Sequence, residues 1–467
     1  MEQLNFLDLA MISAERPHAP YHLCMAGIYD PSTSPAGAPG YEGIMAKLES
    51  LLPEVPALRR KIVKVPWNLD RPYWVDDPDF DLEFHVRHLA LPKPGDWRQY
   101  RTQVARLNSR PLDMSRPPWE FTVIDGVDGV EGCQPGCFAT VLKIHHCVID
   151  GALGVQLYNV IHDTTADASQ PLGERTWTPE PMPSDGELLR RAAVNAVTNP
   201  TRALRSVMGN LTAIGREVVD SRRQPTAKNH PVCRIRFNNR VSPHRTWEEA
   251  RCSLDDLRRV KARVPGATVN DVCISIVGQA LDAYLTALGE PPTCPLVTTV
   301  PVSTRVPGDS TTSGNQVSMM TVSMHTDITD PLQRVAAIRA ETVTKKATQH
   351  GVTMPVLRDV AQALPGALIG TVVRGLAPLM GRGTPQFNTT VTNVPGPATD
   401  QYLMGCKLVR SSGCPPVQDG SGLFHAVSSF AGAFLFAFNA DRAAMPDPEV
   451  YRAHLDRSIA DHVAAAS

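Results

Sequence analysis

Residues that could carry out acid–base chemistry are concentrated in the run HHCVIDG at positions 145–151. A neutral imidazole near pH 7 can accept the proton of an attacking hydroxyl, which is why histidine is the usual general base. Asp150 supplies a carboxylate on the chain that follows, and Gly151 permits a backbone turn that other residues resist. The run therefore predicts a site at which a histidine deprotonates a hydroxyl.

The paired histidines fit two other roles less well. Adjacent residues of a strand point to opposite faces, so His145 and His146 cannot easily share one metal ion. An isolated histidine is most often a satisfied core residue, but here a carboxylate and a glycine follow at close spacing. The sequence therefore predicts no metal site and favours acid–base chemistry.

A strand and a helix must position these residues. Residues 137–146 (CFATVLKIHH) are rich in β-formers and are apolar on both alternating faces, as in an interior strand. Residues 152–161 carry apolar side chains at near-helical spacing. We therefore expect the two histidines at a strand-to-helix junction.

The chain is long enough for two domains. At 467 residues it exceeds what one ordinary hydrophobic core organises. Residues 164–185 are polar and contain several prolines, and residues 187–223 are helical and basic by composition. This pattern predicts an N-terminal domain at 1–163, a crossover linker at 164–231 and a C-terminal domain at 232–467.

Strands and helices alternate in the C-terminal part. Strands are expected at 295–302, 317–325, 387–392 and 430–438, and a helix is expected at 331–344. The last strand (FAGAFLFAF) alternates small and aromatic residues, which core packing explains better than a place in a ligand tunnel. Together with the first half, this alternation predicts an α/β fold.

Composition and targeting signals exclude several classes of protein. With 46 basic and 47 acidic side chains the formal net charge is −1, so no overall field gathers nucleic acid. The N-terminal residues lack a secretory signal, and ten cysteines show no paired spacing, so we expect a cytoplasmic protein with reduced thiols. The apolar stretch 363–381 is interrupted by Pro365, Arg374 and Pro378, which argues against a membrane-spanning helix.

Several motifs resemble one family in detail. The HHxxxDG pattern is the signature of a superfamily that includes chloramphenicol acetyltransferase, carnitine acyltransferases and nonribosomal peptide condensation domains. Residues 74–82 (WVDDPDFDL), 85–95 (HVRHLALPKPG) and 111–120 (PLDMSRPPWE) resemble elements of the bacterial wax ester synthase/diacylglycerol acyltransferase family. The C-terminal blocks that are similar to this family are Asn270-Asp271, PVSTR at 301–305, Gly314-Asn315 and NVPGP at 393–397.

The resemblance implies an α/β fold with two CoA-dependent acyltransferase-like domains of the chloramphenicol acetyltransferase type, each with a mixed sheet, and a tunnel between the domains. It makes His146 the general base and His145 its support. Asp150 and Gly151 complete the catalytic motif, and Asp150 is expected to hold local structure. The remaining residues that the resemblance implicates are Arg305, the candidate ion-pair partner of Asp150, Asn270, a candidate donor to the oxyanion, and Asp271, a structural residue.

The same resemblance supplies candidate substrate-binding residues, which are Pro117, Trp119, Asn393, Pro395 and Gly396. Large aromatic side chains are core residues more often than substrate contacts, so Trp119 also has a structural interpretation. Pro118 stands where the family's PLW element has leucine. This departure leaves the acyl chain-length preference open.

By the resemblance, the reaction is transfer of a fatty acyl group from acyl-CoA, a substrate and not a cofactor, to diacylglycerol or a long-chain alcohol. A thioester already has a good leaving group, so the enzyme needs to deprotonate the alcohol, align both substrates and stabilise the oxyanion. The sequence has no GxSxG motif for a covalent serine nucleophile. Two alternatives stay open: an acyltransferase of specialised metabolism, of the polyketide-associated type, and a non-catalytic binding module. The PLDxxRPxW and NVPGP elements favour the lipid enzyme.

Insoluble acceptors imply contact with a membrane or lipid droplet surface. The basic segment 190–223 is suited to an anionic surface, and the interrupted apolar stretch 363–381 is suited to insertion. For the first segment, the sequence alone favours a solvated basic helix face that bridges two domains over contact with lipid. We therefore expect a cytoplasmic enzyme that associates peripherally with lipid.

Overall fold

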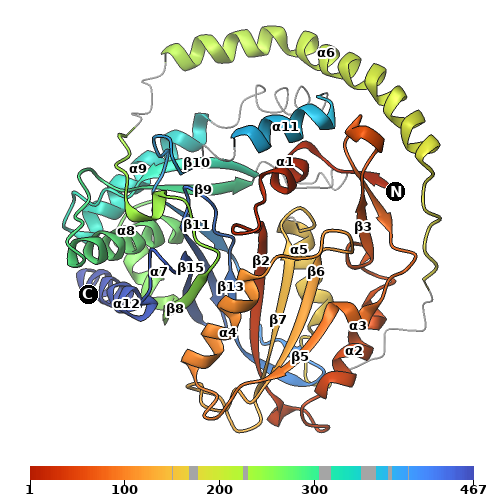
Figure 1. Ribbon diagram of the computed structural model, residues 1–467. Coiled ribbons are helices and arrows are strands. Elements are labelled where there is room, and N and C mark those ends of the chain that lie inside the picture. The colour runs from red at the N-terminus through yellow and green to blue at the C-terminus, as the bar shows by residue number, and fades with distance from the viewer. Residues whose placement is uncertain are drawn as a thin grey trace.

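The computed structural model describes residues 1–149, 151–167, 177–223, 230–303, 317–348, 364–376, 381–397 and 399–467. Within these residues the chain forms two six-stranded mixed sheets and one three-stranded sheet, with helices packed around them (Figure 1). The predicted α/β architecture with two mixed sheets is confirmed.

The first mixed sheet carries the paired histidines. Its order is β12-β13-β2-β7-β6-β5, and within it β5 and β6 are parallel whereas the other neighbours are antiparallel. Its strands are β2 (His22–Asp30), β5 (Val86–Ala90), β6 (Trp119–Asp125), β7 (Phe138–His145), β12 (Tyr402–Leu403) and β13 (Cys406–Cys414). Strand β7 lies between β2 and β6, and all eight of its residues are buried. The interior strand expected over residues 137–146 is confirmed.

Strand β13 comes from the C-terminal part of the chain but pairs with β2. Its antiparallel register runs from Lys407 opposite Asp30 to Cys414 opposite Cys24. Residues 402–414 thus complete the N-terminal sheet. The domain boundaries at 163 and 231 stay a prediction, and this strand crosses them.

The second mixed sheet lies wholly in the C-terminal part and has the order β10-β9-β11-β14-β15-β8. Its strands are β8 (Arg245–Ser253), β9 (Val297–Ser303), β10 (Val317–Ser323), β11 (Thr389–Val394), β14 (Leu423–Phe430) and β15 (Ala433–Asp441). Strand β11 is parallel to both of its neighbours, and the other pairs are antiparallel. The strands expected near 295–302, 317–325 and 387–392 are confirmed.

The single strand predicted at 430–438 is wrong at its first residues. Phe430 ends β14, and Ala433 begins β15, its antiparallel partner. Between them Ala431 and Gly432 have φ angles of 47° and 78°, both in the left-handed region. Two successive left-handed residues make a two-residue hairpin turn, which the aromatic alternation of the segment concealed.

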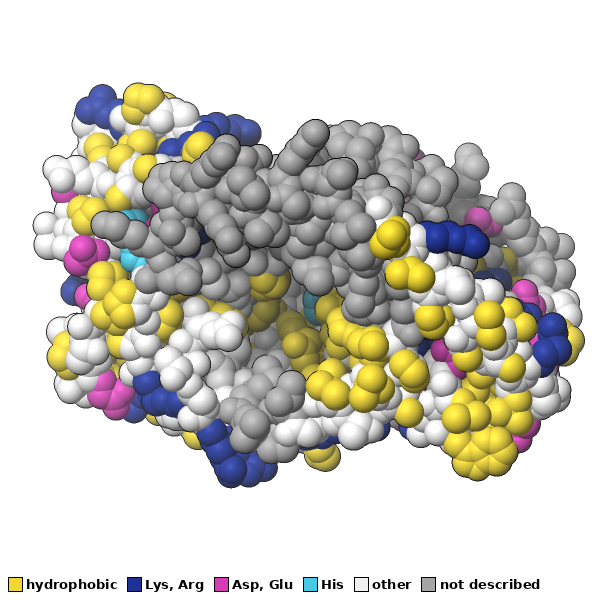
Figure 2. Space-filling model, turned by 90° about the horizontal axis from the view of Figure 1, so that it is seen from above, with side chains coloured by type: hydrophobic (Ala, Val, Ile, Leu, Met, Phe, Trp, Pro, Cys, Tyr) yellow, Lys and Arg dark blue, Asp and Glu magenta, His cyan; other side chains and the backbone are white. Residues whose placement is uncertain are grey.

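Helices cover the sheets and cross between them. They are α1 (Phe6–Ala14), α2 (Gly40–Leu51), α3 (Leu82–His85), α4 (Trp97–Ser109), α5 (Gly151–Ile161), α6 (Asp185–Arg223), α7 (Leu254–Ala262), α8 (Val269–Ala287), α9 (Pro331–Thr348), α11 (Gly366–Leu376) and α12 (Pro448–Ala465). Helix α6 confirms the helical crossover segment, and it runs with α11 along the top of Figure 1, the face that Figure 2 shows from above. Among the described residues, none of the helices combines the length and the apolar character needed to cross a membrane.

Buried polar contacts join the two halves of the molecule. Trp97 and Arg101 of α4 reach the carboxylate of Glu248 on β8, with N–O distances of 2.5 and 3.1 Å. The amide of Asn439 on β15 donates to Asn108 at the other end of α4, at 3.0 Å. Since a buried polar group without its partner costs about 1–3 kcal/mol, these contacts oppose separation of the two sheets.

Three buried histidines, His162, His425 and His462, bond to neighbouring hydroxyl groups. The distances are 2.8 Å from His162 to Tyr29, 2.8 Å from His425 to Tyr451 and 2.7 Å from His462 to Ser275. Burial lowers the pKa of His425 to about 3 and the pKa values of His162 and His462 to about 4. The folded chain therefore keeps all three rings neutral at pH values that would protonate them in the unfolded chain.

We expect the free energy of unfolding to fall as the pH drops from about 6.5 toward 4, because the unfolded chain takes up protons that the folded chain excludes. Each such histidine contributes up to about 1.4 kcal/mol per pH unit in this window. Urea titrations at pH 7.5, 6.0 and 5.0 measure the slope, and a His462→Gln variant should show a shallower one. An unfolding free energy that stays constant across this range would contradict the prediction.

Candidate active site

The paired histidines lie at the end of β7, where carbonyl groups on both sides hold their backbone. The amide of His145 donates to the carbonyl of Pro118 (3.0 Å), and the amide of His146 donates to the carbonyl of Tyr21 (2.9 Å). Pro118 directly precedes β6 and Tyr21 directly precedes β2, so both bonds extend the sheet beyond the last residue of β7. Helix α5 then begins at Gly151, which confirms the strand-to-helix junction.

His145 is buried completely and has both ring nitrogens directed at protein groups. Its Nδ1 accepts from the amide of Cys147 (3.1 Å), so the hydrogen of a neutral ring must lie on Nε2. Nε2 faces the carboxylate of Glu15 at 3.6 Å, a distance too long for a hydrogen bond. Glu15 in turn accepts from the amide of Tyr21 at 3.1 Å. His145 thus belongs to a supporting network around the motif.

His146 differs from its neighbour because it lies one residue past the strand. Its side chain is partly exposed, whereas that of His145 is not. Desolvation of the ring lowers the pKa of His146 below its ordinary value; a backbone hydrogen bond opposes this shift, and the nearby His145 adds to it. A lowered pKa keeps the imidazole neutral at pH 7, the state that a general base requires.

Trp119 is packed as a core residue. Its indole nitrogen donates to the carbonyl of Leu58 (2.7 Å), and its ring stacks on His85 with centroids 4.6 Å apart. These contacts occupy its polar edge and one face, which favours the structural interpretation. The neighbouring Pro117 and Pro118 are also buried. Pro118 contacts His145 only through its backbone carbonyl in this bond. Leucine, which the family has at this position, would supply the same carbonyl, so proline in its place keeps the hydrogen bond.

Asn270 and Asp271 lie in the first turn of α8, in the helix layer of the second sheet. One carboxylate oxygen of Asp271 accepts from the amide and hydroxyl of Thr268 (2.8 and 2.7 Å), and the other accepts from Thr342 (3.0 Å). These contacts fix the start of α8. The side-chain oxygen of Asn270 is buried and has no hydrogen-bond partner among the described residues. The structure places Asn270 in a different layer from His146.

The NVPGP segment lies at the end of β11. Asn393 pairs with Val427 of the parallel strand β14, and Pro395 is exposed. Gly396 approaches the backbone of Ser429 so closely that a Cβ atom would lie 1.8 Å from the carbonyl oxygen. Glycine is therefore required where this turn contacts the end of β14.

Two predicted site residues lie outside the described residues. These are Asp150 and Arg305. Their ion pair therefore stays a prediction, as do the roles of both side chains.

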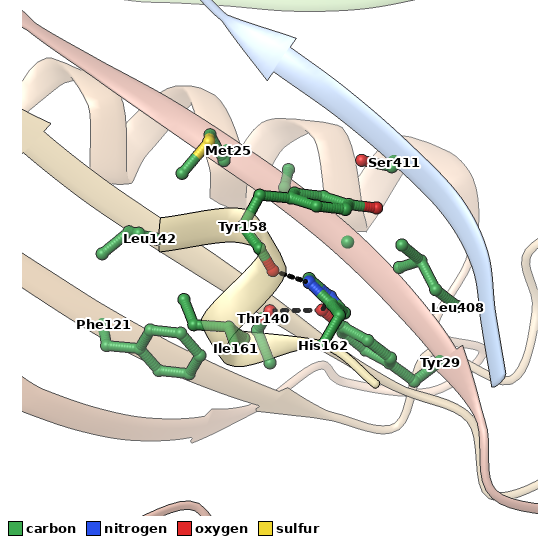
Figure 3. Close-up of a pocket in the computed structure, with 12 residues that line it drawn as sticks. Met25, Tyr29, Phe121, Thr140, Leu142, Tyr158, Ile161, His162, Leu408 and Ser411 are labelled. Atoms are coloured by element: carbon green, nitrogen blue, oxygen red, sulfur yellow. Dashed lines mark hydrogen bonds between the residues drawn. The ribbon is translucent and has the colours of Figure 1, made fainter. Parts of the chain in front are cut away.

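A cavity of about 30 Å³ lies beside α5, between β2, β7 and β13 (Figure 3). Tyr29, Tyr158 and His162 lie along it, and His162 bonds to the hydroxyl of Tyr29 (2.8 Å) and the carbonyl of Tyr158 (2.9 Å). One water molecule needs roughly 10–15 Å³ on this measure, so the cavity has room for two or three waters and is too small for an acyl chain. The interdomain tunnel stays a prediction.

Sequence reasoning missed the residues that support the motif from a distance. Glu15, Tyr21 and the carbonyl of Pro118 contact the paired histidines but carry no signal of their own in the sequence. His22 lies opposite His145 across β2 and β7, and its Nε2 lies 2.6 Å from the carbonyl of Asn108. Only the strand pairing brings these groups together.

We expect Gly396→Ala to displace the NVPGP turn, because the added methyl group overlaps the Ser429 carbonyl. Overpacking of this kind costs about 1–3 kcal/mol of stability. If the turn contributes to substrate binding, KM should rise while kcat changes little. Gly413→Ala is the matched control, since its Cβ would make an ordinary contact at 3.5 Å. Thermal melts and acyl-transfer kinetics that do not distinguish the two variants would show that the close approach is unimportant.

Comparisons with known proteins cover the whole chain. Residues 4–273 match the wax ester synthase/diacylglycerol acyltransferase catalytic domain, and residues 313–461 match the WS/DGAT C-terminal domain. A Mycobacterium tuberculosis protein named as a candidate diacylglycerol O-acyltransferase is 31% identical over 436 residues, 92% of this chain and 84% of that protein. The O-acyltransferase WSD of Acinetobacter baylyi is 26% identical over 470 residues, 98% of this chain and 96% of that protein.

Two solved structures share the fold. The wax ester synthase/diacylglycerol acyltransferase from Marinobacter aquaeolei VT8 has a TM-score of 0.68 and 23% identity, with all of both chains covered. The starter condensation domain of rhizomide synthetase, solved as a mutant with C8-CoA and Leu-SNAC, has a TM-score of 0.57 and 16% identity. That comparison covers all of this chain and 94% of the other.

Proposed function

Because this chain belongs to the wax ester synthase/diacylglycerol acyltransferase family, we propose that it transfers a fatty acyl group from acyl-CoA to diacylglycerol or a long-chain alcohol, with His146 as the general base. Family membership makes it an acyltransferase. The acyl donor, the acceptors and the identity of the base are the proposal. The observation that carries it is the position of His146 one residue past the end of β7, where the residue is half-buried, its amide bonds to Tyr21 and its pKa is lowered.

In this mechanism His146 takes the proton of the acceptor hydroxyl as its oxygen attacks the thioester carbonyl carbon. The carbon–sulfur bond of the tetrahedral intermediate then breaks, and the imidazolium gives its proton to the departing CoA sulfur, which restores the neutral His146. The products are the ester and free CoA, and no covalent enzyme intermediate forms. Asn270 is the proposed donor to the oxyanion, which an amide can stabilise in a site closed to water.

Two comparisons support acyl-CoA and a lipid acceptor. A condensation domain with this fold has been solved with C8-CoA, which supports a CoA thioester as acyl donor. The relatives with whole-chain matches carry diacylglycerol O-acyltransferase or O-acyltransferase names, which favours a lipid acceptor over one of specialised metabolism.

One assay tests the choice of acceptor. The purified chain is given one long-chain acyl-CoA with diacylglycerol, a fatty alcohol or a short polar alcohol, and both ester formation and CoA release are measured. Ester formation with diacylglycerol or the fatty alcohol supports the proposal. Activity confined to the short polar alcohol would favour specialised metabolism, and CoA release in no reaction would favour a binding module.

We expect His146→Ala to lower kcat by roughly 10²–10⁴-fold or more, the usual contribution of general acid–base catalysis. His145→Ala should cost less, because that ring supports the site and does not contact the acceptor. In the wild type, the acid limb of kcat/KM should have an apparent pKa below 6.5, since desolvation favours the neutral ring of His146. Near-native turnover by His146→Ala, with circular dichroism showing a folded protein, would exclude His146 as the base.

Peripheral binding to lipid is also part of the proposal, and an apolar surface supports it. Exposed hydrophobic side chains gather on the 3₁₀ turn η3 (Pro66–Asn68), on α6 and on α11. They are Trp67, Leu69, Val194, Val197, Leu204, Met208, Leu368 and Val372, and we name this set the apolar face. Turn η3 contacts both α6 and α11, so it links the two helices that carry most of this set. Figure 2 shows hydrophobic side chains around a hollow on the side of the molecule that carries these helices.

The apolar face of α6 is separate from the side that docks on the protein. Val194, Val197, Leu204 and Met208 recur at helical spacing and form one exposed stripe. Leu188 and Ala192 lie on another side and pack against the three-stranded sheet of β1 (Glu2–Gln3), β3 (Arg60–Val63) and β4 (Tyr73–Asp76). A helix with a second apolar stripe open to solvent is suited to lie in a lipid interface.

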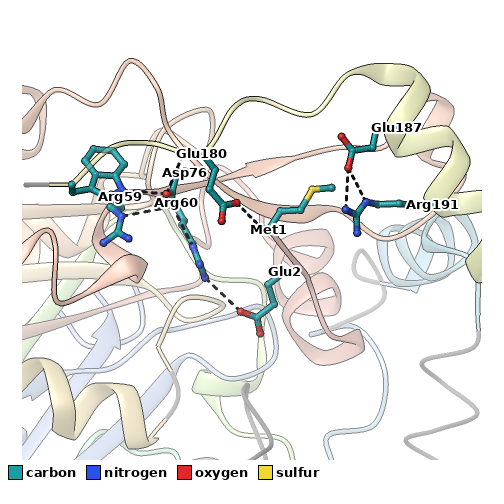
Figure 4. A network of polar contacts seen from close by, with 9 residues as sticks. Met1, Glu2, Arg59, Arg60, Asp76, Glu180, Glu187 and Arg191 are labelled. Atoms are coloured by element: carbon teal, nitrogen blue, oxygen red, sulfur yellow. Dashed lines mark hydrogen bonds and ion pairs between the residues drawn. The ribbon is translucent and has the colours of Figure 1, made fainter.

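Polar contacts fix the start of the crossover segment beneath this face (Figure 4). Asp76 accepts from the indole of Trp177 (3.2 Å) and pairs with Arg60 (3.4 Å). Glu180 pairs with the amino group of Met1 at 2.8 Å. The residues that lead into α6 are therefore tied to the N-terminal part.

Helix α11 is also held against the N-terminal part of the chain. Gly366 allows it to approach the backbone of Asp70, since a Cβ would lie 2.6 Å from that carbonyl oxygen. Arg16 donates to the carbonyl of Arg374 at 2.9 Å. Contacts with the N-terminal part thus hold both α6 and α11, the helices that carry most of the apolar face.

We expect the double variant Leu204→Glu, Met208→Glu to lose most binding to liposomes, because it places charge in the apolar stripe of α6. Liposome flotation with anionic and with neutral vesicles measures this, at low and high salt. Binding that survives high salt indicates apolar insertion, whereas loss at high salt indicates the basic residues of α6. Val450→Glu, an exposed valine on α12 away from this face in Figure 1, is the control. Equal flotation of both variants, or no flotation of the wild type, would refute lipid binding through this face.

A further inference from the structure

Three side chains from distant parts of the sequence converge near the end of the crossover segment. They are His230, in the last residues of that segment, His325, just after β10, and Glu341 on α9. The Nε2 atoms of His230 and His325 lie 3.3 and 3.1 Å from the same carboxylate oxygen, Oε2 of Glu341. All three side chains are half-buried, and their ligand atoms lie within 4.8 Å of one another.

We propose that His230, His325 and Glu341 form a binding site for a divalent transition-metal ion of the zinc type. Two imidazole nitrogens and one carboxylate oxygen are ligands that zinc accepts in proteins. Three protein ligands leave the fourth tetrahedral position for water or another small ligand. This site is independent of the acyl-transfer proposal, because none of its residues belongs to the candidate active site.

The distances from Glu341 to the two histidines fit a tetrahedral site. With metal–ligand bonds of about 2.0–2.1 Å, neighbouring ligand atoms of a tetrahedron lie about 3.3 Å apart. The two nitrogen–oxygen distances of 3.3 and 3.1 Å are close to this value. The two rings are inclined at 80° with centroids 5.7 Å apart, so they approach Glu341 from different directions. An ion could bind with small side-chain movements.

Neighbouring groups orient the carboxylate. The other oxygen of Glu341, Oε1, accepts from the amide of Ser323 (3.2 Å) and from Lys345 (2.7 Å). These bonds direct Oε2 toward the two rings, as outer-shell contacts do in metal sites. Lys345 also lowers the net negative charge of the site, so the imidazoles must supply much of the affinity.

The backbone conformation of His325 is a second observation in favour of a binding site. Its φ angle is 46°, in the left-handed region that non-glycine residues seldom adopt. Its amide donates to the hydroxyl of Ser323 (3.1 Å), which stabilises this conformation. Strain of this kind concentrates at functional sites, where it aims a side chain that a relaxed backbone would direct elsewhere.

Binding of a metal here would fix the end of the crossover segment to the second sheet. The start of the segment is tied to the N-terminal part by Trp177 and Glu180. At the other end, His230 would join β10 and α9 through the ion. The sequence predicts no metal site, and this proposal replaces that expectation: the ligands are so far apart in the chain that no spacing motif reveals them.

The test uses the full-length chain without an affinity tag, stripped of metal by a chelator and then titrated with ZnCl₂. We expect the wild type to bind one more equivalent of Zn²⁺ than His325→Ala or His230→Ala, or to bind that equivalent at least tenfold more tightly. Mg²⁺, which prefers oxygen ligands, should not compete. Cysteines that bind zinc adventitiously remain in every variant, so they do not affect the difference.

Two variants complete the design. Glu341→Gln keeps the size of the side chain but removes its charge and should weaken zinc binding while the protein stays folded by circular dichroism. His88→Ala is the matched control, because His88 pairs with Asp125 at 2.6 Å but belongs to no three-ligand cluster among the described residues. Zinc should raise the unfolding temperature of the wild type and of His88→Ala only.

Cobalt substitution reports the geometry directly, because tetrahedral Co²⁺ gives strong visible bands that octahedral Co²⁺ lacks. We expect these bands in the wild type. They should be lost in His230→Ala, because that variant lacks the ring that contacts Glu341. Equal zinc stoichiometry and affinity in the wild type, His230→Ala and His325→Ala would overturn the proposal. The cluster would then be held by hydrogen bonds alone.

Discussion

Two backbone hydrogen bonds at the end of β7 set the geometry of the candidate site. The amides of His145 and His146 donate to carbonyls of Pro118 and Tyr21, one on each side of the strand. Because β2 and β6 flank β7 along its length, these two acceptors are placed by the whole first sheet. The position of His146, the proposed base, therefore depends on the completeness of that sheet, to which β13 from the distant C-terminal part also belongs.

A single step along the chain gives the two adjacent histidines different surroundings. His145 is the last residue of a buried strand, and its ring lies among Cys147 and Glu15 inside the protein. His146 has left the strand, so its ring reaches a partly exposed position while its backbone stays fixed. The same residue type thus serves as support in one position and as the proposed base in the next. The difference arises from strand termination and not from any property of the side chains.

The sequence predicted the features that depend on local pattern. Apolar residues on both faces identified β7, helical spacing identified α5, and the basic helical run identified α6. The hairpin turn at Ala431-Gly432 was missed, because alanine in the left-handed region leaves no compositional signal. Features that depend on contact between distant segments could not be predicted from the sequence either. They are β13 in the first sheet, Glu15 beside His145, and the three-ligand cluster at Glu341. Long-range pairing is decided by tertiary packing, which one sequence does not display.

The pairing of β13 with β2 has a consequence for biosynthesis. About 270 residues separate the end of β7 from the end of β13. At a synthesis rate of roughly 5–20 residues per second, the ribosome needs on the order of 15–50 s to supply the missing strand. During that time β2 presents an open edge, and open edges pair readily with other strands. Until the C-terminal segment emerges, this edge of the nascent N-terminal half is therefore a place where a chaperone or another strand can bind.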